Sequence, residues 1–356
     1  MNKKGIGFLG LASRICLLVI LVTFLVGASG CMEQPGDNDV DGTVNLVDSA
    51  GRNLTIEQPV ERIVTLTSDS AEAVRALDSG GKIVGVTKYM KGTDFWGNIS
   101  DQPAVGSCFS PNYEKIAELD PDLVITYSKW AEDLEDKLRP FNITVVRLDF
   151  YKMDSVDTEL QKLGKVLDKR ERAEELLDFY ETQKNKIKSN LSELPEEQRL
   201  DVYIEGHEPY STASRESGWH QVLELVGADN IAEDLNATYP DVSSEWVLEN
   251  NPDVIVKVVT GDAFGYNIDN STRASEIYGE IVNREGLSEV DAVKDGKVIL
   301  ISEDVLSAMR HPVGATYLAK GLYPEKLKDL EPGEIHETYL EEFQNIRYDG
   351  NWFYRK

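Results

Sequence analysis

Residues 155–191 have the sequence SVDTELQKLGKVLDKRERAEELLDFYETQKNKIKSNL, which contains no proline. Gly164 is its only interior glycine and costs a helix about 1 kcal/mol relative to alanine. Helix-ending chemistry arrives only at Pro195. We therefore expect one continuous helix, roughly 50 Å long, that can join one domain to another. Steps of three and four place the apolar residues on one face of this helix: Val156, Leu160, Leu163, Leu167, Leu176, Leu177, Tyr180, Ile187 and Leu191.

A similar pattern stands on either side of this stretch, at residues 113–126 and 244–257. Each copy begins with a short helical segment that has glutamate in second position, Glu114 or Glu245. Each segment ends where proline disfavours the helical conformation of the preceding residue. Each then continues as a β-branched run without alternation, as in a strand that is buried on both faces. Unless a common helix-to-strand joint has recurred by chance, the chain contains two α/β lobes.

Composition excludes several classes of partner. The 356 residues carry 63 acidic and 37 basic side chains, a net charge of −26. This charge argues against nucleic acid or an anionic membrane surface as partner. The three cysteines are Cys16, Cys31 and Cys108. Cys108 is the only one that does not belong to the N-terminal segment, so we expect no disulfide.

The N-terminus has the order of a secretory signal. Basic Lys3, Lys4 and Arg14 precede an apolar run over residues 15–26, and small residues lead to Cys31. These small residues resemble a lipoprotein cleavage box, which makes Cys31 the expected lipid anchor. Ala28 stands where leucine is usual, so an uncleaved signal-anchor is the alternative. Either way, the protein would be exported and held on the outer face of the cytoplasmic membrane.

We expect six parts along the chain. They are a signal peptide (1–30), a flexible tether (31–42), an N-terminal lobe (43–152), a bridging helix (153–192), a C-terminal lobe (193–345) and a C-terminal tail (346–356). The expected fold class is α/β, with two lobes of mostly parallel sheets that are flanked by helices and bridged by a single long helix. Six Asn-x-Ser/Thr sequons also fit an exterior location. They begin at Asn53, Asn98, Asn142, Asn190, Asn236 and Asn270.

The accumulated motifs resemble the substrate-binding proteins of ATP-driven importers for iron chelates and cobalamin. The resemblance covers about residues 43–345, with the motifs in family order. In the first lobe these motifs are the 44–56 hairpin, Glu61–Leu66, Lys82–Val86 and the Glu114–Ile125 segment. In the second lobe they are Val222–Ile231 and Asn251–Val256. The resemblance implies two lobes bridged by one rigid helix, independently of the argument from residues 155–191.

The resemblance also implies partners: an ABC permease with its ATPase, and a metal chelate such as a ferric siderophore, haem or cobalamin. One glutamate on each lobe would meet arginines of the permease. By position these are Glu72 and Glu224, although Glu216 competes with Glu224. We expect a monomer that has no intrinsic cofactor and is not an enzyme.

The ligand would lie between the lobes, because ligands of open α/β sheets bind outside the carboxyl ends of the strands. Aromatic residues in the loops there suit a flat or bulky ligand. Arg310 could pair with an anionic group, and His311 could ligate metal or donate a hydrogen bond. The candidates are Tyr89, Trp96, Tyr127, Trp130 and Tyr151 in the first lobe, and His207, Tyr210, Trp219, Tyr266, Arg310 and His311 in the second.

Three other functions are alternatives to chelate binding. Capture of a bare metal is disfavoured, because the four histidines lie at positions 207, 220, 311 and 336 and show no clustered ligand spacing. An enzyme is disfavoured because the common nucleophile, phosphate and zinc motifs are missing from the sequence. A binder of a small oxyanion such as molybdate or tungstate on the same fold stays open. Thr67-Ser68 or Ser107 and Ser110 would then supply hydroxyl groups.

Overall fold

The computed structural model describes residues 42–90 and 94–356, which fall within one compact unit, Asn38–Lys356. The expected signal peptide, Cys31 and nearly all of the tether lie outside the described residues. Within the described part of the chain, none of the helices has the length and apolar character needed to cross a membrane.

The first lobe is built on a four-stranded parallel sheet of order β4-β3-β7-β8. Its strands are β3 (Ile63–Thr65), β4 (Ile83–Val86), β7 (Leu123–Thr126) and β8 (Thr144–Arg147). Every residue of β3 and β7 is buried, as their unbroken apolar runs predict. A hairpin of β1 (Thr43–Val47) and β2 (Asn53–Glu57) precedes the sheet, where the sequence predicts one.

The second lobe contains a five-stranded sheet of order β10-β9-β11-β13-β15. The parallel strands are β9 (Asp201–Glu205), β10 (Asp229–Asn230), β11 (Val254–Val259) and β13 (Val298–Ser302). The last strand, β15 (Phe353–Arg355), pairs antiparallel with β13. The C-terminal tail therefore packs on the second lobe by supplying an edge strand to this sheet.

The two similar segments form the same local structure in both lobes. Helices α2 (Tyr113–Glu118) and α7 (Ser244–Asn250) are capped by the side chains of Asn112 and Ser243. Before the proline in each copy, one residue adopts a left-handed conformation (Asp120, φ 45°; Asn251, φ 38°). These shared caps and turns, with the strands that follow, confirm two α/β lobes.

The aspartate after each proline ties the new strand to its neighbour. Asp122 Oδ2 accepts a hydrogen bond from the backbone N–H of Arg62 at 2.8 Å. Asp253 Oδ2 accepts one from Asp201 N–H at 3.0 Å. The Pro-Asp pair therefore ends the helix and also fixes where the adjacent strand begins.

The expectation of one continuous helix over residues 155–191 is wrong. The stretch forms α4 (Val156–Val166) and α5 (Arg170–Leu191), separated by a turn in which Asp168 has φ 53°. Lys169 N–H donates to Gly164 C=O at 2.7 Å, and Asp168 N–H donates to Lys165 C=O at 3.4 Å. This is the Schellman arrangement that ends many helices.

Gly164 permits the two helices to pack closely. A Cβ atom on Gly164 would lie 2.7 Å from the Cβ of Ala173 in α5, closer than two such atoms approach. Arg172 Nε in α5 donates to Ala76 C=O of the first lobe, and the Tyr180 hydroxyl donates to Met309 C=O of the second. The 22-residue α5, about 33 Å long, therefore contacts both lobes and is the bridging helix. The other domain boundaries stay a prediction.

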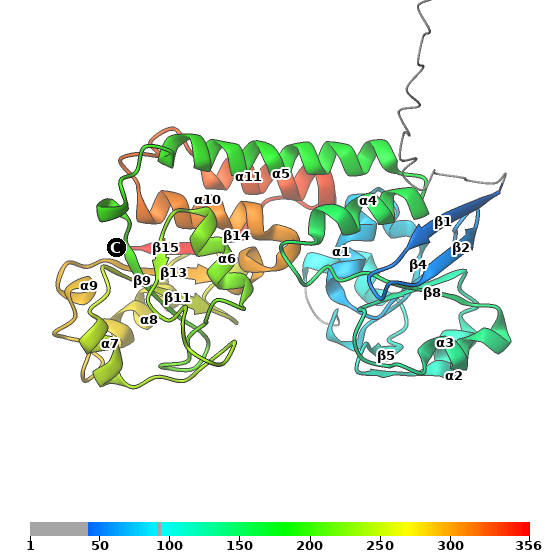
Figure 1. Cartoon of the computed structure of the whole chain (residues 1–356), viewed down its shortest axis with the longest axis horizontal. Coiled ribbons are helices and arrows are strands. Elements are labelled where there is room, and N and C mark those ends of the chain that lie inside the picture. Colours follow the sequence, from blue (N-terminus) through cyan, green and yellow to red (C-terminus); the bar gives the residue numbers. More distant parts are fainter. Residues whose placement is uncertain (1–41, 91–93) are drawn as a thin grey trace, which may run out of the picture. The chain divides into compact units, whose positions relative to one another are not determined.

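Helices cover the sheets and line α5. Figure 1 shows α5 running alongside α10 and meeting α4, and α5 packs against both of these helices. The remaining helices are α1 (Ser68–Ala76), α3 (Leu134–Leu138), α6 (Gly218–Leu225), α8 (Thr272–Val282), α9 (Asp291–Lys294), α10 (His311–Leu322) and α11 (Pro332–Thr338). A π-helical turn at Tyr339–Phe343 continues α11. The short strands are β5 (Gly106–Ser107), β6 (Ser110–Pro111), β12 (Gly265–Tyr266) and β14 (Gly350–Asn351).

Candidate ligand-binding cleft

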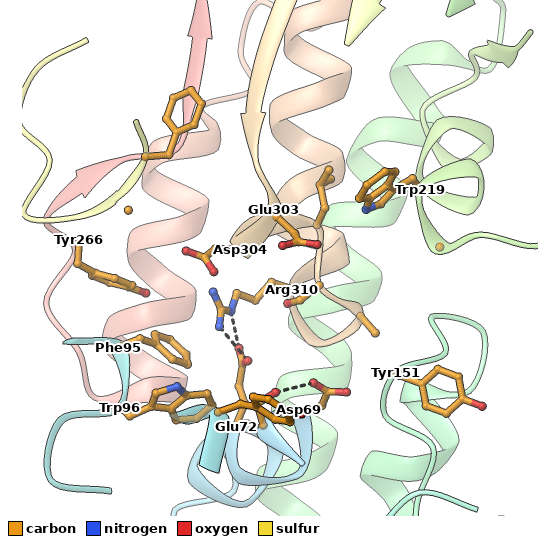
Figure 2. Close-up of a pocket in the computed structure, with 18 of the residues that line it drawn as sticks. Asp69, Glu72, Phe95, Trp96, Tyr151, Trp219, Tyr266, Glu303, Asp304 and Arg310 are labelled. Carbon is orange, nitrogen blue, oxygen red and sulfur yellow. Dashed lines mark hydrogen bonds and ion pairs between the residues drawn. The ribbon is translucent and has the colours of Figure 1, made fainter. Parts of the chain in front are cut away.

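A cavity of about 720 Å³ is lined by residues of both lobes (Figure 2). Ser68 and Asp69 follow β3, Tyr151 follows β8, and Glu303 and Asp304 follow β13. These are the carboxyl ends of parallel strands, where ligands of such sheets bind. Eight of the lining residues are aromatic: Tyr89, Phe95, Trp96, Tyr151, Trp219, Tyr239, Phe264 and Tyr266.

The floor of the cavity contains an ion pair. Arg310 Nε and Nη2 donate to the two carboxylate oxygens of Glu72 at 2.7 and 3.0 Å. Tyr339 donates a third hydrogen bond to Glu72 Oε1 at 2.7 Å. Burial alone would lower the pKa of Arg310, but the charge and hydrogen bonds of Glu72 raise it well above its usual range. Arg310 is therefore a permanent cation whose charge is balanced by Glu72.

Several polar atoms on this floor have no partner. Arg310 Nη1, the Tyr266 hydroxyl and the Ser307 hydroxyl are all buried, and none makes a hydrogen bond. All three residues line the cavity. Because a buried polar group without a partner is costly, these atoms are available to a ligand oxygen or to water.

The walls of the cavity are acidic. Among the described residues that line it, the acids are Asp69, Glu72, Glu303 and Asp304, and Arg310 is the only base. Burial raises the pKa of Asp69, against the opposing effect of a hydrogen bond from the Tyr127 hydroxyl. Because Glu72 already balances Arg310, the remaining acids make the cavity unfavourable for an anion.

The structure places six of the eleven expected ligand-binding residues on the cavity lining: Tyr89, Trp96, Tyr151, Trp219, Tyr266 and Arg310. The expected role of Arg310 needs correction. Two of its nitrogens are held by Glu72, so only Nη1 is free to donate.

Four other candidates do not line the cavity: Tyr127, Trp130 and His207 lie beside it, and Tyr210 packs elsewhere in the second lobe. The ring of Tyr127 lies 4.7 Å from that of Tyr151, and Trp130 lies 6.2 Å from the same ring. His207 lies 6.1 Å from the ring of Trp219 and 3.2 Å from the Glu303 carboxylate. The Tyr210 ring faces Arg284, 5.1 Å from its guanidinium carbon, and Tyr210 N–H donates to Glu205.

The expectation that His311 binds the ligand in the cleft is wrong. Its imidazole is 5% exposed, its Nδ1 lies 2.6 Å from Ala308 C=O, and its ring lies 6.1 Å from that of Tyr180. Because it opens α10 and turns into the core, it does not line the cavity. Nor do the described residues contain a group of three or more side chains that could hold a metal ion.

Glu72 cannot serve as a docking glutamate. Its exposed fraction is 3%, and its carboxylate is held by Arg310 and Tyr339. A permease arginine could not reach it from outside. Glu224 is different, because its side chain is 61% exposed, 3.6 Å from His220. Its docking role stays a prediction.

Sequence reasoning missed the acidic lining residues Asp69, Glu303 and Asp304, and the aromatic Phe95, Tyr239 and Phe264. The signal for the acids was present. Asp69 stands four residues after β3, and Glu303-Asp304 come directly after β13. Charged residues that directly follow buried strands are therefore the signal that predicts the acidic lining.

Comparisons with known proteins agree with this architecture. A family model described as periplasmic binding protein matches residues 63–305. The chain is 25% identical over 327 residues to an uncharacterized ABC transporter substrate-binding lipoprotein, YvrC, of Bacillus subtilis, covering 88% of this chain and 97% of that protein. It is 25% identical to the cobalamin-binding protein of Halobacterium salinarum, covering 71% of this chain and 70% of the relative.

Molybdate-binding protein MolA of Haemophilus influenzae is 23% identical, covering 85% of this chain and 91% of MolA. Among solved structures, the TroA-like periplasmic binding protein FepB of Veillonella parvula superposes with a TM-score of 0.74 at 23% identity. That superposition covers 87% of this chain and 99% of FepB. At this identity the likeness establishes the fold and leaves the ligand to be argued from the cleft.

Proposed function

Because the chain belongs to the periplasmic binding protein family, we propose that it captures a metal chelate in the interlobe cleft and delivers it to the permease of an ABC importer. The observation that carries the proposal is the aromatic and acid-rich cavity at the carboxyl ends of the strands of both lobes. Aromatic side chains supply contact area at low entropic cost, which suits a bulky ligand.

The charge of the cleft narrows the class of chelate. Asp69, Glu303 and Asp304 lack a matching base among the described lining residues. They disfavour the propionates of haem and the charge of anionic ferric chelates. A neutral or cationic chelate fits, and Arg310 Nη1 would donate to one of its carbonyl oxygens. A corrinoid, whose rim carries neutral amides, is therefore the first candidate among ferric siderophores, haem and cobalamin.

A small oxyanion such as molybdate is the second candidate, favoured by the 23% identity to MolA. An oxyanion site needs several free donors that converge on one point. Of the four hydroxyl candidates, Ser68 lines the cavity, whereas Thr67, Ser107 and Ser110 do not. The free donors on the cavity floor share it with Asp69, Glu303 and Asp304, and Arg310 is already paired with Glu72. These features support the chelate over the oxyanion.

Glu114 and Glu245 fit the docking role better than Glu72. They occupy matching second positions in α2 and α7, one in each lobe, and both are exposed. Each helix leads into the N-terminal end of a parallel strand, so its first turn lies toward the carboxyl ends, on the side of the cavity. In Figure 1 both helices lie on the side away from α5. We take this pair as the docking glutamates, with Glu224 as the competitor in the second lobe.

Location completes the proposal. An exported protein with a lipidated Cys31 would stay on the outer face of the cytoplasmic membrane, within reach of the permease. The similarity to a substrate-binding lipoprotein of Bacillus subtilis supports that anchor. Mass spectrometry of the membrane-extracted protein tests it, because a mature chain beginning at Cys31 with added acyl mass is expected.

The ligand is tested by absorbance titration of the purified protein with cyanocobalamin, a ferric hydroxamate, haem and molybdate in parallel. We expect saturable binding of cyanocobalamin or the neutral ferric hydroxamate, and none of molybdate. The variant Tyr266→Ala removes a ring from the cavity lining and should weaken binding of the chelate. Binding of molybdate alone would replace the chelate with the oxyanion.

A further inference from the structure

Beside the cleft lies an aromatic surface of which only Tyr151 lines the cavity. It consists of Phe109, Tyr127, Trp130 and Tyr151, here called the mouth cluster. The ring of Trp130 lies 4.8 Å from that of Phe109, 5.9 Å from Tyr127 and 6.2 Å from Tyr151. Phe109 is 57% exposed and Trp130 40%, so both offer ring surface to solvent.

The backbone that carries Trp130 is unusual. Trp130 and Ala131 have φ values of 68° and 44°, two consecutive residues with side chains in the left-handed region. Such residues normally avoid this conformation because the Cβ meets the backbone. Strain of this kind persists only where surrounding contacts impose it, and it is found most often at functional sites.

Arg147, at the end of β8, imposes it. Its guanidinium donates to the carbonyl oxygens of Tyr127, Trp130 and Ala131, each at 2.9 Å. Its Nε and Nη2 also donate to the Glu135 carboxylate at 2.7 and 3.0 Å. These five bonds use all five N–H donors of an arginine. Arg147 is 4% exposed, so it holds the loop from within and is not part of the exposed ring surface.

The arrangement is rigid before any ligand arrives. Glu135 also forms an ion pair with Arg52, and this contact fixes the carboxylate that orients Arg147. The Tyr127 hydroxyl is held by Asp69, a cavity residue. A preformed aromatic surface loses little freedom when it binds, which is how affinity is gained without new contacts.

The mouth cluster is continuous with the cleft. Tyr151 belongs to the cluster and also lines the cavity. Of the seven large apolar side chains that are exposed in the described residues, Tyr89 and Tyr239 line the cavity, and Phe109 and Trp130 belong to the cluster. If a ligand in the cavity carries a projecting group, that group would therefore reach the aromatic rings of the mouth cluster.

We infer that the mouth cluster is a second subsite, which binds a flat, π-bearing arm that projects from the chelate, and that Arg147 is the positioning residue that holds Trp130 for it. The inference rests on the proposed function and adds the chemical class of one part of the ligand. Stacking on an aromatic ring recognises any planar heterocycle through its face, and exposed aromatic edges and faces suit it.

The probes are two corrinoids that differ in this arm: cyanocobalamin, which carries a planar base, and dicyanocobinamide, which lacks it. The wild-type protein should bind cyanocobalamin roughly tenfold more tightly than dicyanocobinamide. Trp130→Ala should remove this preference by weakening cyanocobalamin alone. Phe141→Ala, which removes a ring that is 55% exposed outside the mouth cluster, is the matched control and should leave both affinities unchanged.

Arg147→Lys tests the positioning role. Lysine keeps the charge but cannot donate to three carbonyls and a carboxylate at once. In protein labelled with 5-fluorotryptophan, the ¹⁹F resonance of Trp130, assigned with Trp130→Phe, should shift or broaden in Arg147→Lys. The resonance of buried Trp352 should stay in place. The corrinoid preference should fall together with the change at Trp130.

Each contrary outcome has a distinct meaning. Equal wild-type affinity for the two corrinoids, or equal weakening of both by Trp130→Ala, overturns the subsite and leaves the proposed function standing. Lost transport in Trp130→Ala with both affinities unchanged assigns the cluster to the permease and also overturns the subsite. If neither corrinoid binds, the corrinoid proposal fails and the inference falls with it. An unchanged Trp130 resonance in Arg147→Lys overturns the positioning role.

Discussion

Glu72 of α1 and Arg310, 238 residues later, meet in a doubly hydrogen-bonded ion pair at the floor of the cleft. Both side chains are less than a tenth exposed. The pair connects the first lobe to the segment before α10 in the second. It fixes one point of contact between the lobes and removes most of the positive charge that an anionic ligand would need.

Breaking this pair on one side should be costly. Arg310→Met leaves the Glu72 carboxylate buried without its counter-ion, and we expect a loss of roughly 3–5 kcal/mol in the free energy of unfolding. The double variant Glu72→Gln/Arg310→Met should lose less than Arg310→Met alone, because no unpaired charge stays buried. Urea unfolding measures both. The exposed Glu114→Gln is the control, with an expected change within about 0.5 kcal/mol.

A small loss of stability would mean that the pair contributes little to the stability of the free protein. Should Arg310→Met lose less than about 1 kcal/mol, water must reach Glu72 in the free protein. The pair would then belong to the ligand-bound arrangement and not to the stability of the fold.

The sequence predicts the two lobes because each depends on local chemistry. In both copies an N-cap, a short helix, a proline and an aspartate lie within a few residues of one another, and each acts on its neighbours. The Glu72–Arg310 pair has no local signature. Its partners belong to different lobes, so only the assembled fold shows that Glu72 is buried and cannot dock.

The sequence contains signals for the break between α4 and α5. The apolar pattern skips from Leu167 to Leu176, and the charged run between them offers no core-facing residue except Ala173. Gly164 enters a prediction from the sequence only through its cost to a helix. Its proximity to Ala173 shows that it serves the contact between two helices.

Two glycine-to-alanine substitutions should therefore have opposite effects. Gly164→Ala gains about 1 kcal/mol in helix propensity but places a Cβ 2.7 Å from that of Ala173, and overpacking typically costs about 1–3 kcal/mol. We expect a net loss. Gly279→Ala in α8, where nothing lies within 4 Å of the new Cβ, should gain up to about 1 kcal/mol. Thermal unfolding of the two variants side by side decides this; a stabilised Gly164→Ala would contradict the packed joint.

Charge reversal at the proposed docking pair should separate transport from binding. Glu114→Lys and Glu245→Lys should each reduce uptake by cells that carry the cognate permease, and the double variant should nearly abolish it, because two like charges would meet the permease arginines. The dissociation constant for the ligand should stay within about twofold of the wild-type value. Uptake of labelled ligand and titration of the purified protein measure the two quantities.

The same helices supply the matched control. Glu118 and Glu249 are also equivalent and exposed, but they lie at the opposite ends of α2 and α7. Glu118→Lys and Glu249→Lys should leave uptake intact. If they impair it as much as the first pair, general electrostatic attraction explains docking and no specific glutamate does.

Buried histidines should make the protein less stable in acid. Burial lowers the pKa of His311 to about 4 from an ordinary value of 6.5, against the opposing effects of the hydrogen bond with Ala308 C=O and the charge of Asp157. Burial lowers the pKa of His336 well below the same ordinary value. The unfolded chain therefore binds protons at these sites between about pH 6.5 and 4, where the folded protein does not. The sign follows from this difference: the free energy of unfolding falls as pH decreases, by up to about 1.4 kcal/mol per pH unit for each such histidine.

Urea unfolding at intervals from pH 7 to pH 4 measures this slope. His311→Gln should reduce the slope by as much as one proton, whatever its effect on stability at pH 7, and His336→Gln should remove a comparable part. The two charged groups that act on His311, Asp157 and Lys184, form an ion pair with each other at 3.0 Å. A His311→Gln protein with the wild-type slope would mean that the imidazole already takes up its proton in the folded state, and that the start of α10 opens to water in acid.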